Sequence, residues 1–270
     1  MQIGKILVVY DPTTNTQPAL ARAALIAERE KVTVHIFSCI YTELGKSGEA
    51  AAQRKKLLSA QQEIVAAAAA PLIEKGIEVT TEIEWDEDWY QAVVSASINN
   101  HADVVLKASH RHSATQRLLK PSSDRTLIRQ CPCPVLLVKG AVNRDARKVL
   151  AAIDARGEKD SYKQLNENIL NFCQRFMQTN NAELHFVNAH KGLSDRPDKG
   201  SLVRACGVAA DNVHIKMGDP DKVILEVAKS LNVNLIVIGN SARSGLAALI
   251  NTNTAEKILD EMDCDLLALP

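Results

Sequence analysis

The sequence has few aromatic residues and no excess of either charge, and both shortages exclude classes of function. Phe, Trp and Tyr make up 4% of the 270 residues, which argues against stacking platforms for single-stranded nucleic acid. Lys and Arg together number 32, as do Asp and Glu, so the formal net charge is 0. Proteins that coat nucleic acid or bind membrane surfaces generally carry a basic excess. We therefore expect no specific nucleic-acid partner.

Export signals, membrane spans and a disulfide framework are also missing from the sequence. The longest apolar run, 64–73, contains Pro71 and is too short to cross a bilayer. The chain runs from Met1 into a strand-like segment without the basic start, apolar core and cleavage site of a signal peptide. Its six cysteines are scattered through apolar or helical surroundings, as is typical of reduced thiols. We expect a cytoplasmic protein.

What the sequence does contain is a regular alternation of strand and helix patterns. Hydrophobic residues are 46% and charged residues 24% of the chain, as expected of a globular protein. Apolar strand patterns cover Lys5–Tyr10, Val32–Cys39, Ile77–Trp85, Asp103–Leu106, Val135–Lys139, Lys148–Ile153, Glu183–Val187, Val213–Met217, Leu235–Ile238 and Asp265–Leu269. Helix patterns cover Gln17–Glu30, Gly48–Lys75, Asp88–Asn99, Ser123–Gln130, Ser161–Asn180, Asp219–Leu231 and Thr254–Met262. This alternation predicts an α/β fold with parallel sheets flanked by helices.

The second half of the chain repeats the first. The run Lys5–Asp11 resembles Lys148–Asp154, and Cys133-Pro134-Val135-Leu136 aligns with Cys264-Asp265-Leu266-Leu267. Because the repeating unit is a whole domain, the pattern indicates a duplication. We expect two tandem Rossmann-like domains, 1–140 and 147–270, each with a five-stranded sheet, joined by a small polar linker.

The two halves differ in the connection between their second and third strands. The first half has the long helix pattern Gly48–Lys75 there, whereas the second offers only a brief helical stretch near Ser201–Cys206. An uncovered apolar sheet face often marks a partner or ligand. The alternative, that the first helix simply wraps further, stays open.

The loop after the fourth strand of the second half is the strongest candidate for a ligand site. In open α/β sheets, ligands bind beyond the carboxyl ends of strands. Gly239 and the small residues after it allow close approach of a phosphate, and Arg243 adds a permanent charge. Thr252 or Asn253 can cap the helix that begins at Thr254, whose N-terminus favours an anion.

These motifs resemble those of tandem universal stress proteins, in particular the E-type two-domain members. In that family the loop reads Gly-x-x-Gly and, at a set spacing, Gly-Ser or Gly-Thr, and it binds ATP phosphates. Here Gly239 matches the first glycine and Arg243-Ser244-Gly245 the Arg-Ser-Gly that follows it, but Ala242, Thr252 and Asn253 replace the remaining motif residues. The resemblance implies that Asp154 contacts the adenosine moiety. The implied site, for a weakly bound ATP or other adenine nucleotide, consists of Asp154, Gly239, Ala242, Arg243, Ser244, Thr252, Asn253 and Thr254.

The first half departs further from the family motif. Arg111 and Pro121 fall at glycine positions, so its loop cannot cradle a phosphate in the same way, although Asp11 is retained. His110 and His112 share a face if the segment is extended and could ligate zinc, with a cysteine or Asp124 as third ligand. The alternative is a polar loop with a basic rim.

No catalytic motif is present: the chain lacks a Gly-x-Ser-x-Gly elbow, a P-loop lysine and a His-Glu-x-x-His helix. The leading hypothesis is therefore a non-enzymatic stress-response protein that senses or binds a ligand through its second domain. One alternative is a weak nucleotide hydrolase or transferase, with Asp154 or Asp219 binding a metal. Another is an interaction scaffold in which both pockets are vestigial.

The fifth strands, Val135–Lys139 and Asp265–Leu269, predict an intramolecular pseudo-dimer, with further homodimerisation left open. Apolar edge strands invite pairing, and fusion raises the effective concentration to roughly the millimolar range or above. We expect Leu137→Glu or Leu267→Glu to cause aggregation, measured by light scattering. The control is Lys56→Glu, on a predicted outer helix face. Monodisperse Leu137→Glu and Leu267→Glu proteins, or fifth strands on remote edges, would contradict the prediction.

Overall fold

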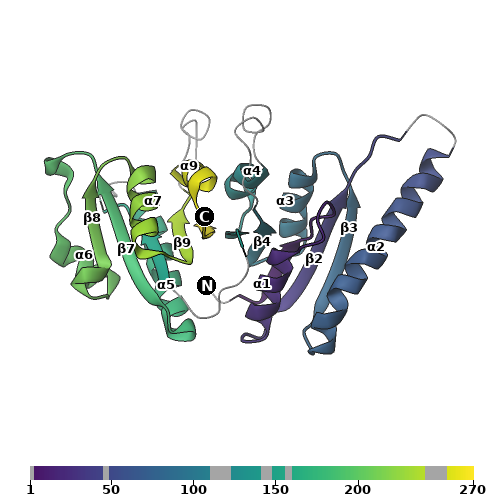
Figure 1. The fold of residues 1–270 in the computed structure, drawn as a ribbon, viewed down its shortest axis with the longest axis horizontal. Helices are drawn as coiled ribbons and strands as arrows, with labels where there is room; N and C mark the ends of the chain where they lie inside the picture. Colours follow the sequence, from purple (N-terminus) through teal and green to yellow (C-terminus); the bar gives the residue numbers. More distant parts are fainter. Residues whose placement is uncertain (1–2, 45–48, 110–122, 141–147, 156–159, 241–253) are drawn as a thin grey trace. The chain divides into compact units, whose positions relative to one another are not determined.

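The computed structural model describes residues 3–44, 49–109, 123–140, 148–155, 160–240 and 254–270, which form two compact units that meet in sequence after residue 138 (Figure 1). In chain order the first unit contains β1 (Lys5–Val9), α1 (Pro18–Ala27), β2 (Thr33–Ile40), α2 (Ala50–Glu74), β3 (Val79–Trp85), α3 (Trp89–Asn99), β4 (Val104–Ala108), α4 (Ser123–Gln130) and β5 (Val135–Val138). Its strands lie in the order β3-β2-β1-β4-β5, and every neighbouring pair is parallel.

The second unit repeats this topology. It contains β6 (Lys148–Ala152), α5 (Asp160–Asn180), β7 (Glu183–His190), α6 (Lys199–Cys206), β8 (Val213–Met217), α7 (Pro220–Leu231), β9 (Leu235–Gly239), α9 (Thr254–Glu261) and β10 (Asp265–Leu269). Its strand order is β10-β9-β6-β7-β8, again parallel throughout. The predicted fold class, two tandem α/β domains with five-stranded parallel sheets, is confirmed.

Helices cover both faces of each sheet. The chain crosses from β1 to β3 in one direction and returns to β4 and β5 in the other, so right-handed crossovers place the two pairs of helices on opposite faces. Accordingly α3 packs against α4, and α7 packs against α9. The central strands are buried on both sides, as Ile6, Leu7, Leu150 and Ile236 are fully buried. Their continuous apolar runs follow from this burial.

Two predicted strands end two or more residues too early. β7 continues to His190, beyond the predicted end at Val187, because its backbone still pairs with β8 as far as Met217. β4 runs through Lys107 to Ala108 instead of stopping at Leu106, and Lys107 pairs in register with Val9 and Leu137. A lysine inside a buried strand requires a compensating partner, which is described below.

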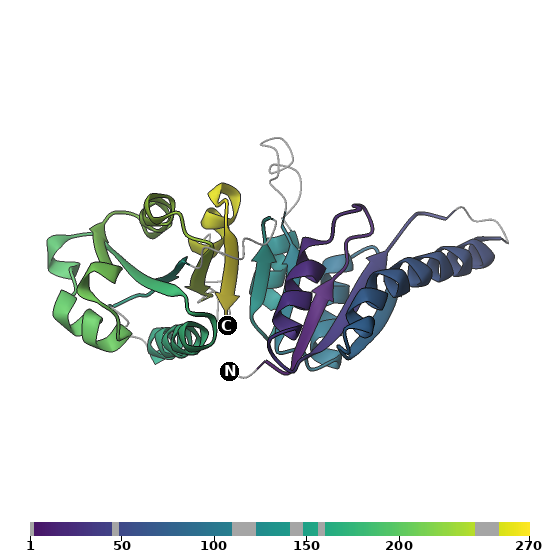
Figure 2. The same ribbon diagram turned by 60° about the horizontal axis from the view of Figure 1, so that its bottom comes forward.

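The connections between the second and third strands differ in length and in the surface they bury. α2 has 25 residues and buries a stripe of Gln61, Val65, Ala69 and Leu72, while its first turns project beyond the sheet (Figure 2). α6 has 8 residues. It is preceded by the N-cap Asp198, whose carboxylate accepts hydrogen bonds from the backbone N–H and hydroxyl of Ser201. The helix is followed by the C-cap Gly207, which has a φ of 66°.

The two units, whose helices α2 and α6 differ in length, also differ in one polar contact near the ends of their sheets. In the first unit Ser38 donates to the carbonyl of Tyr10 and accepts a hydrogen bond from the Gln61 amide of α2. In the second unit Asn188 donates to the carbonyl of Ile153, the counterpart of Tyr10. α6, with 8 residues, has no counterpart of Gln61. None of the helices in the described part of the chain has the length and apolar character of a membrane span.

Candidate functional site

The candidate site of each unit lies where strand order reverses. β1 is flanked by β2 and β4, and β6 by β7 and β9, so the crossovers on the two sides of each central strand leave in opposite directions. Ligands in open α/β sheets bind at such points, beyond the carboxyl ends of the strands. Asp154 follows β6, and Gly239 ends the adjacent strand β9. Thr254, also predicted as a site residue, is the first residue of α9.

Most of the predicted phosphate loop lies outside the described residues. This applies to Ala242, Arg243, Ser244, Thr252 and Asn253. It also applies to the first-unit loop, including Arg111, Pro121 and the two candidate zinc ligands His110 and His112. Within the described part of the chain, no group of three or more His, Cys, Asp or Glu side chains could bind a metal ion.

Gly239, which is predicted to allow close approach of a phosphate, also has a packing role. A Cβ built on Gly239 would lie 2.3 Å from Cγ and Cδ2 of Leu165, a residue of α5. Such an approach is impossible for a real side chain, so only glycine lets α5 pack this closely against β9. A substitution at Gly239 would therefore disturb the helix–sheet contact as well as any phosphate contact, and it is a poor test of ligand binding.

The first unit contains a carboxylate of its own at the start of the helix that follows its loop. Asp124, in the first turn of α4, accepts a hydrogen bond from the Ser109 hydroxyl at 2.5 Å and forms an ion pair with Lys107 Nζ at 2.8 Å. The side chains of Lys107 and Asp124 are only 14% and 5% exposed. Lys107 also donates to the carbonyl of Ala108 and lies over the Trp89 ring. A helix N-terminus favours negative charge. At the start of α4 the Asp124 carboxylate supplies that charge.

The second unit has apolar side chains at the matching positions. Since β4 aligns with β9 and α4 with α9 at constant spacing, Lys107 corresponds to Ile238 and Asp124 to Ala255. Both of these residues are buried. Ile238 and Ala255 therefore cannot form an ion pair like that of Lys107 and Asp124.

The strand-one aspartates of the two units also differ. The Asp11 carboxylate is used within its own turn, where Oδ1 accepts hydrogen bonds from the backbone N–H and the hydroxyl of Thr13 at 2.8 and 2.6 Å. The backbone of half-buried Asp154 exchanges two hydrogen bonds with the side-chain amide of Asn166 in α5. Asp154 therefore lies two residues after the end of β6, with a backbone partner that the sequence motifs did not indicate.

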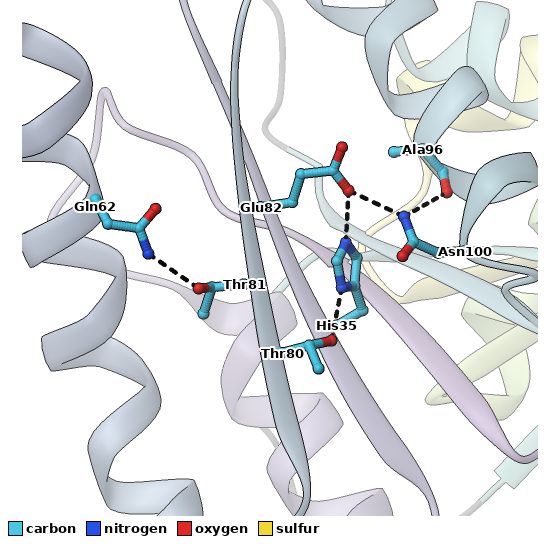
Figure 3. Close-up of polar contacts among 7 residues, drawn as sticks. All are labelled: His35, Gln62, Thr80, Thr81, Glu82, Ala96 and Asn100. Carbon is cyan, nitrogen blue, oxygen red and sulfur yellow. Dashed lines mark hydrogen bonds and ion pairs between the residues drawn. The ribbon is translucent and has the colours of Figure 1, made fainter. Parts of the chain in front are cut away.

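A buried histidine occupies the same strand position in both sheets, away from these loops. Figure 3 shows His35 of β2 between two residues of β3: Nδ1 lies 2.7 Å from the Thr80 hydroxyl and Nε2 lies 3.0 Å from Glu82 Oε2. Glu82 also accepts a hydrogen bond from Asn100. The neighbouring Thr81 points to the opposite face, toward Gln62 of α2. These contacts give His35 a structural role in the sheet.

The matching histidine of the second unit belongs to a chain of three titratable groups. His185 Nε2 lies 3.0 Å from Glu183 Oε1, and its Nδ1 lies 3.2 Å from His214 Nε2. An ionised carboxylate can only accept, so His185 donates to Glu183 and accepts from His214. Burial lowers the pKa of His214, and the positive charges of Lys199, Lys216 and, when it is protonated, His185 lower it further. The hydrogen bond from His185, helped by Lys148, lowers the pKa of Glu183.

Comparisons with known proteins cover nearly the whole chain. The family model described as the universal stress protein family matches residues 2–139 and 146–270. The chain is 28% identical to universal stress protein E of Photorhabdus laumondii, over 98% of this chain and 94% of that protein. It is 27% identical to universal stress protein E of Escherichia coli, over 98% and 93%. A solved universal stress protein structure from Pseudomonas aeruginosa superposes with a TM-score of 0.76 at 27% identity, over 99% and 93% of the two chains.

The buried ion pair of the first unit predicts a compensating pair of substitutions. Lys107→Ile alone leaves the Asp124 carboxylate buried without its cation, which costs about 3–5 kcal/mol of stability. Lys107→Ile combined with Asp124→Ala, which installs the residues of the second unit, should recover most of that loss. Urea denaturation of the wild type, Lys107→Ile, Asp124→Ala and the double variant measures it. If the loss of stability in the double variant equals the sum of the losses in the two single variants, Lys107 and Asp124 do not stabilise each other.

The lowered pKa of His214 predicts that the second unit loses stability in acid. The unfolded chain, whose histidine has a pKa near 6.5, takes up a proton at a pH where folded His214 is still neutral. Stability attributable to His214 is therefore present above about pH 6.5 and falls as the pH drops below it. His214→Asn should flatten the dependence of the thermal midpoint on pH in this range. His101→Asn, at an exposed residue of the first unit, is the control and should leave the slope unchanged.

Proposed function

The chain belongs to the universal stress protein family through both of its halves, and from this premise we propose that it is a stress-response protein that binds an adenine nucleotide through its second unit. Binding, without dedicated catalysis, is the function that its residues support best. The first unit then serves as a scaffold with a degenerate site.

The observation that carries this proposal is the buried Lys107–Asp124 pair of the first unit. Asp124 places a negative charge at the start of α4, where a ligand phosphate would otherwise be attracted. At the corresponding positions of the second unit, Ile238 and Ala255 supply neither charge. An anion would thus meet an internal competitor in the first unit and none from these positions in the second.

The loop of the second unit supports weak rather than tight binding. Its frame from Gly239 to Asn253 keeps the family spacing and includes Arg243, but Ala242 and Thr252 replace glycines. Each added side chain disfavours a positive φ and close backbone approach. Each strained or lost contact costs about 1–3 kcal/mol. The dissociation constant for ATP is therefore expected to be micromolar to millimolar, or too high to detect.

Titration of ATP into the full chain tests the proposal, with two variants that each remove one arginine from a loop. Arg243→Ala, in the second unit, should weaken ATP binding by about tenfold, because a charge-assisted contact to phosphate is lost. Arg111→Ala makes the same charge change in the first-unit loop and should leave the affinity unchanged. A loss in Arg111→Ala instead would place the site in the first unit.

Two further outcomes of the same titration would favour the alternative functions. Absence of binding at millimolar ATP would support an interaction scaffold. Multiple-turnover release of phosphate from ATP and Mg²⁺ would support a nucleotide hydrolase, which needs a metal-binding carboxylate. Asp154 and Asp219 were the candidates for that role. They follow β6 and β8, which are separated by β7, so the sheet does not bring them together as neighbours.

A further inference from the structure

The contact between His185 and His214 has room for only one proton. His185 Nδ1 and His214 Nε2 lie 3.2 Å apart, and His185 Nε2 donates to Glu183. With neutral rings, the proton between the two facing nitrogens belongs to His214, and His185 accepts the hydrogen bond. If both rings are protonated, both facing nitrogens carry a proton and neither can accept. The hydrogen bond is then lost, and two positive charges face each other.

The cations near His214 add to this repulsion. Burial lowers the pKa of His214, and the positive charges of Lys199 in α6 and Lys216 in β8 lower it further. The carboxylate of Glu226 in α7 pairs with Lys216 Nζ at 2.6 Å, where both side chains are exposed. Glu226 thus offsets the charge of Lys216 on the surface and makes no ion pair with His214.

The carboxylate beside the histidine pair, Glu183, contacts His185 at its other ring nitrogen. Glu183 Oε1 lies 3.0 Å from His185 Nε2, and its Oε2 lies 3.5 Å from Lys148 Nζ. Glu183 can therefore offset one positive charge, on His185, and Lys148 competes for it. The buried side chains of α7, the helix that packs against β7, are all apolar and add no further charge.

The first unit has a carboxylate at the position of His214. His35 and His185 occupy the same position in β2 and β7, and the strand registers then align Glu82 with His214. A proton added to His35 creates an ion pair with Glu82, which lies 3.0 Å from Nε2. A second proton added to the histidine pair of the second unit creates repulsion instead. The same strand position thus responds to acid with opposite signs in the two units.

The histidine contact joins β8 to the rest of the second unit. β8 is the last strand in the sheet order, with β7 as its neighbour, and α6 packs against it. The residues that α6 buries are Leu202 and Cys206. Separation of the two rings therefore weakens the attachment of both β8 and α6.

We propose that the contact between His185 and His214 is a pH-sensitive switch, which holds β8 and α6 on β7 when at most one ring is protonated and releases them when both are. The released state binds a proton that the attached state excludes. Because an unperturbed histidine has a pKa near 6.5, the released fraction is small above that pH and rises as the pH falls below it. At the corresponding position of the first unit, Glu82 replaces the second histidine, so this response is confined to the second unit.

The thiol of Cys206 reports the release of α6. Its residue is 1% exposed, and burial raises its pKa to about 11, so it reacts slowly while α6 is attached. The full chain is labelled with dithiodipyridine at about pH 7.5 and about pH 5.5, on either side of the ordinary histidine pKa. The labelling rate of the Cys206 peptide, measured by mass spectrometry, is divided by that of the urea-unfolded chain at the same pH. We expect this ratio to rise about tenfold at the lower pH, the effect of one excluded proton.

Two variants of His214 test whether this contact is the cause. His214→Gln removes the titrating ring, but its amide can either donate to or accept from His185 Nδ1. His214→Glu installs the residue of the first unit. In both variants the ratio should change by less than about twofold between the two pH values.

His190→Asn is the control, because it removes another buried histidine of β7. His190 Nδ1 lies 2.9 Å from the carbonyl oxygen of Gly192, which accepts a hydrogen bond from a neutral or a charged ring alike. The tenfold rise should therefore remain in His190→Asn.

A wild-type protein without the rise overturns the proposal, as does a rise that persists in His214→Gln or His214→Glu. Loss of the rise in His190→Asn as well as in His214→Gln also overturns it, because the response would then not depend on this one contact. If His214→Gln does not fold, His214→Glu decides the question, since its carboxylate can pair with protonated His185 as Glu82 pairs with His35.

Discussion

Each unit of this protein depends on covering both faces of a parallel sheet, and the places of Asp154 and Gly239 follow from that constraint. Parallel strands need long return connections, so helices must alternate with strands and pack on the two faces. At the central strands β1 and β6, the helical connections to the neighbouring strands on the two sides run in opposite directions. The carboxyl ends of these strands and of their neighbours β4 and β9 then lie at one edge of the sheet. Asp11 and Asp154 lie there for the same topological reason.

Duplication of this framework left the two edges with different side chains. In the first unit, a lysine in β4 and an aspartate in α4 satisfy each other inside the protein. In the second unit, isoleucine and alanine take these positions and carry no charge. Since an isolated buried charge is far costlier than a pair, replacing only one of Lys107 and Asp124 costs more stability than replacing both. The two units therefore differ in electrostatic character while sharing one topology.

The fold class was predictable from the sequence, whereas most of the polar contacts were not. The alternation of apolar strands and helices, with the repeat of Lys5–Asp11 in Lys148–Asp154, was enough to predict two α/β domains with five-stranded parallel sheets. Lys107 carried a visible signal, since a lysine in the buried run Val104–Ala108 demands a counter-charge. Its partner Asp124 belongs to another helix, and no local pattern links the two. Asn166 carried no signal, because a polar residue in a helix normally faces solvent. The role of Gly239 in packing depends on the Leu165 side chain, which a motif cannot indicate.

The difference in length between α2 and α6 has a consequence for how each sheet opens. Local unfolding requires the least free energy where the fewest apolar contacts must be broken. The strand β3 is covered by the long helix α2, whereas β8 is covered on the same face by the 8 residues of α6, and Met217 at its end is 66% exposed. The backbone amides of β7 and β8 should thus exchange with solvent through smaller openings than those of β2 and β3. A duplicated fold in this way contains two edges of unequal local stability.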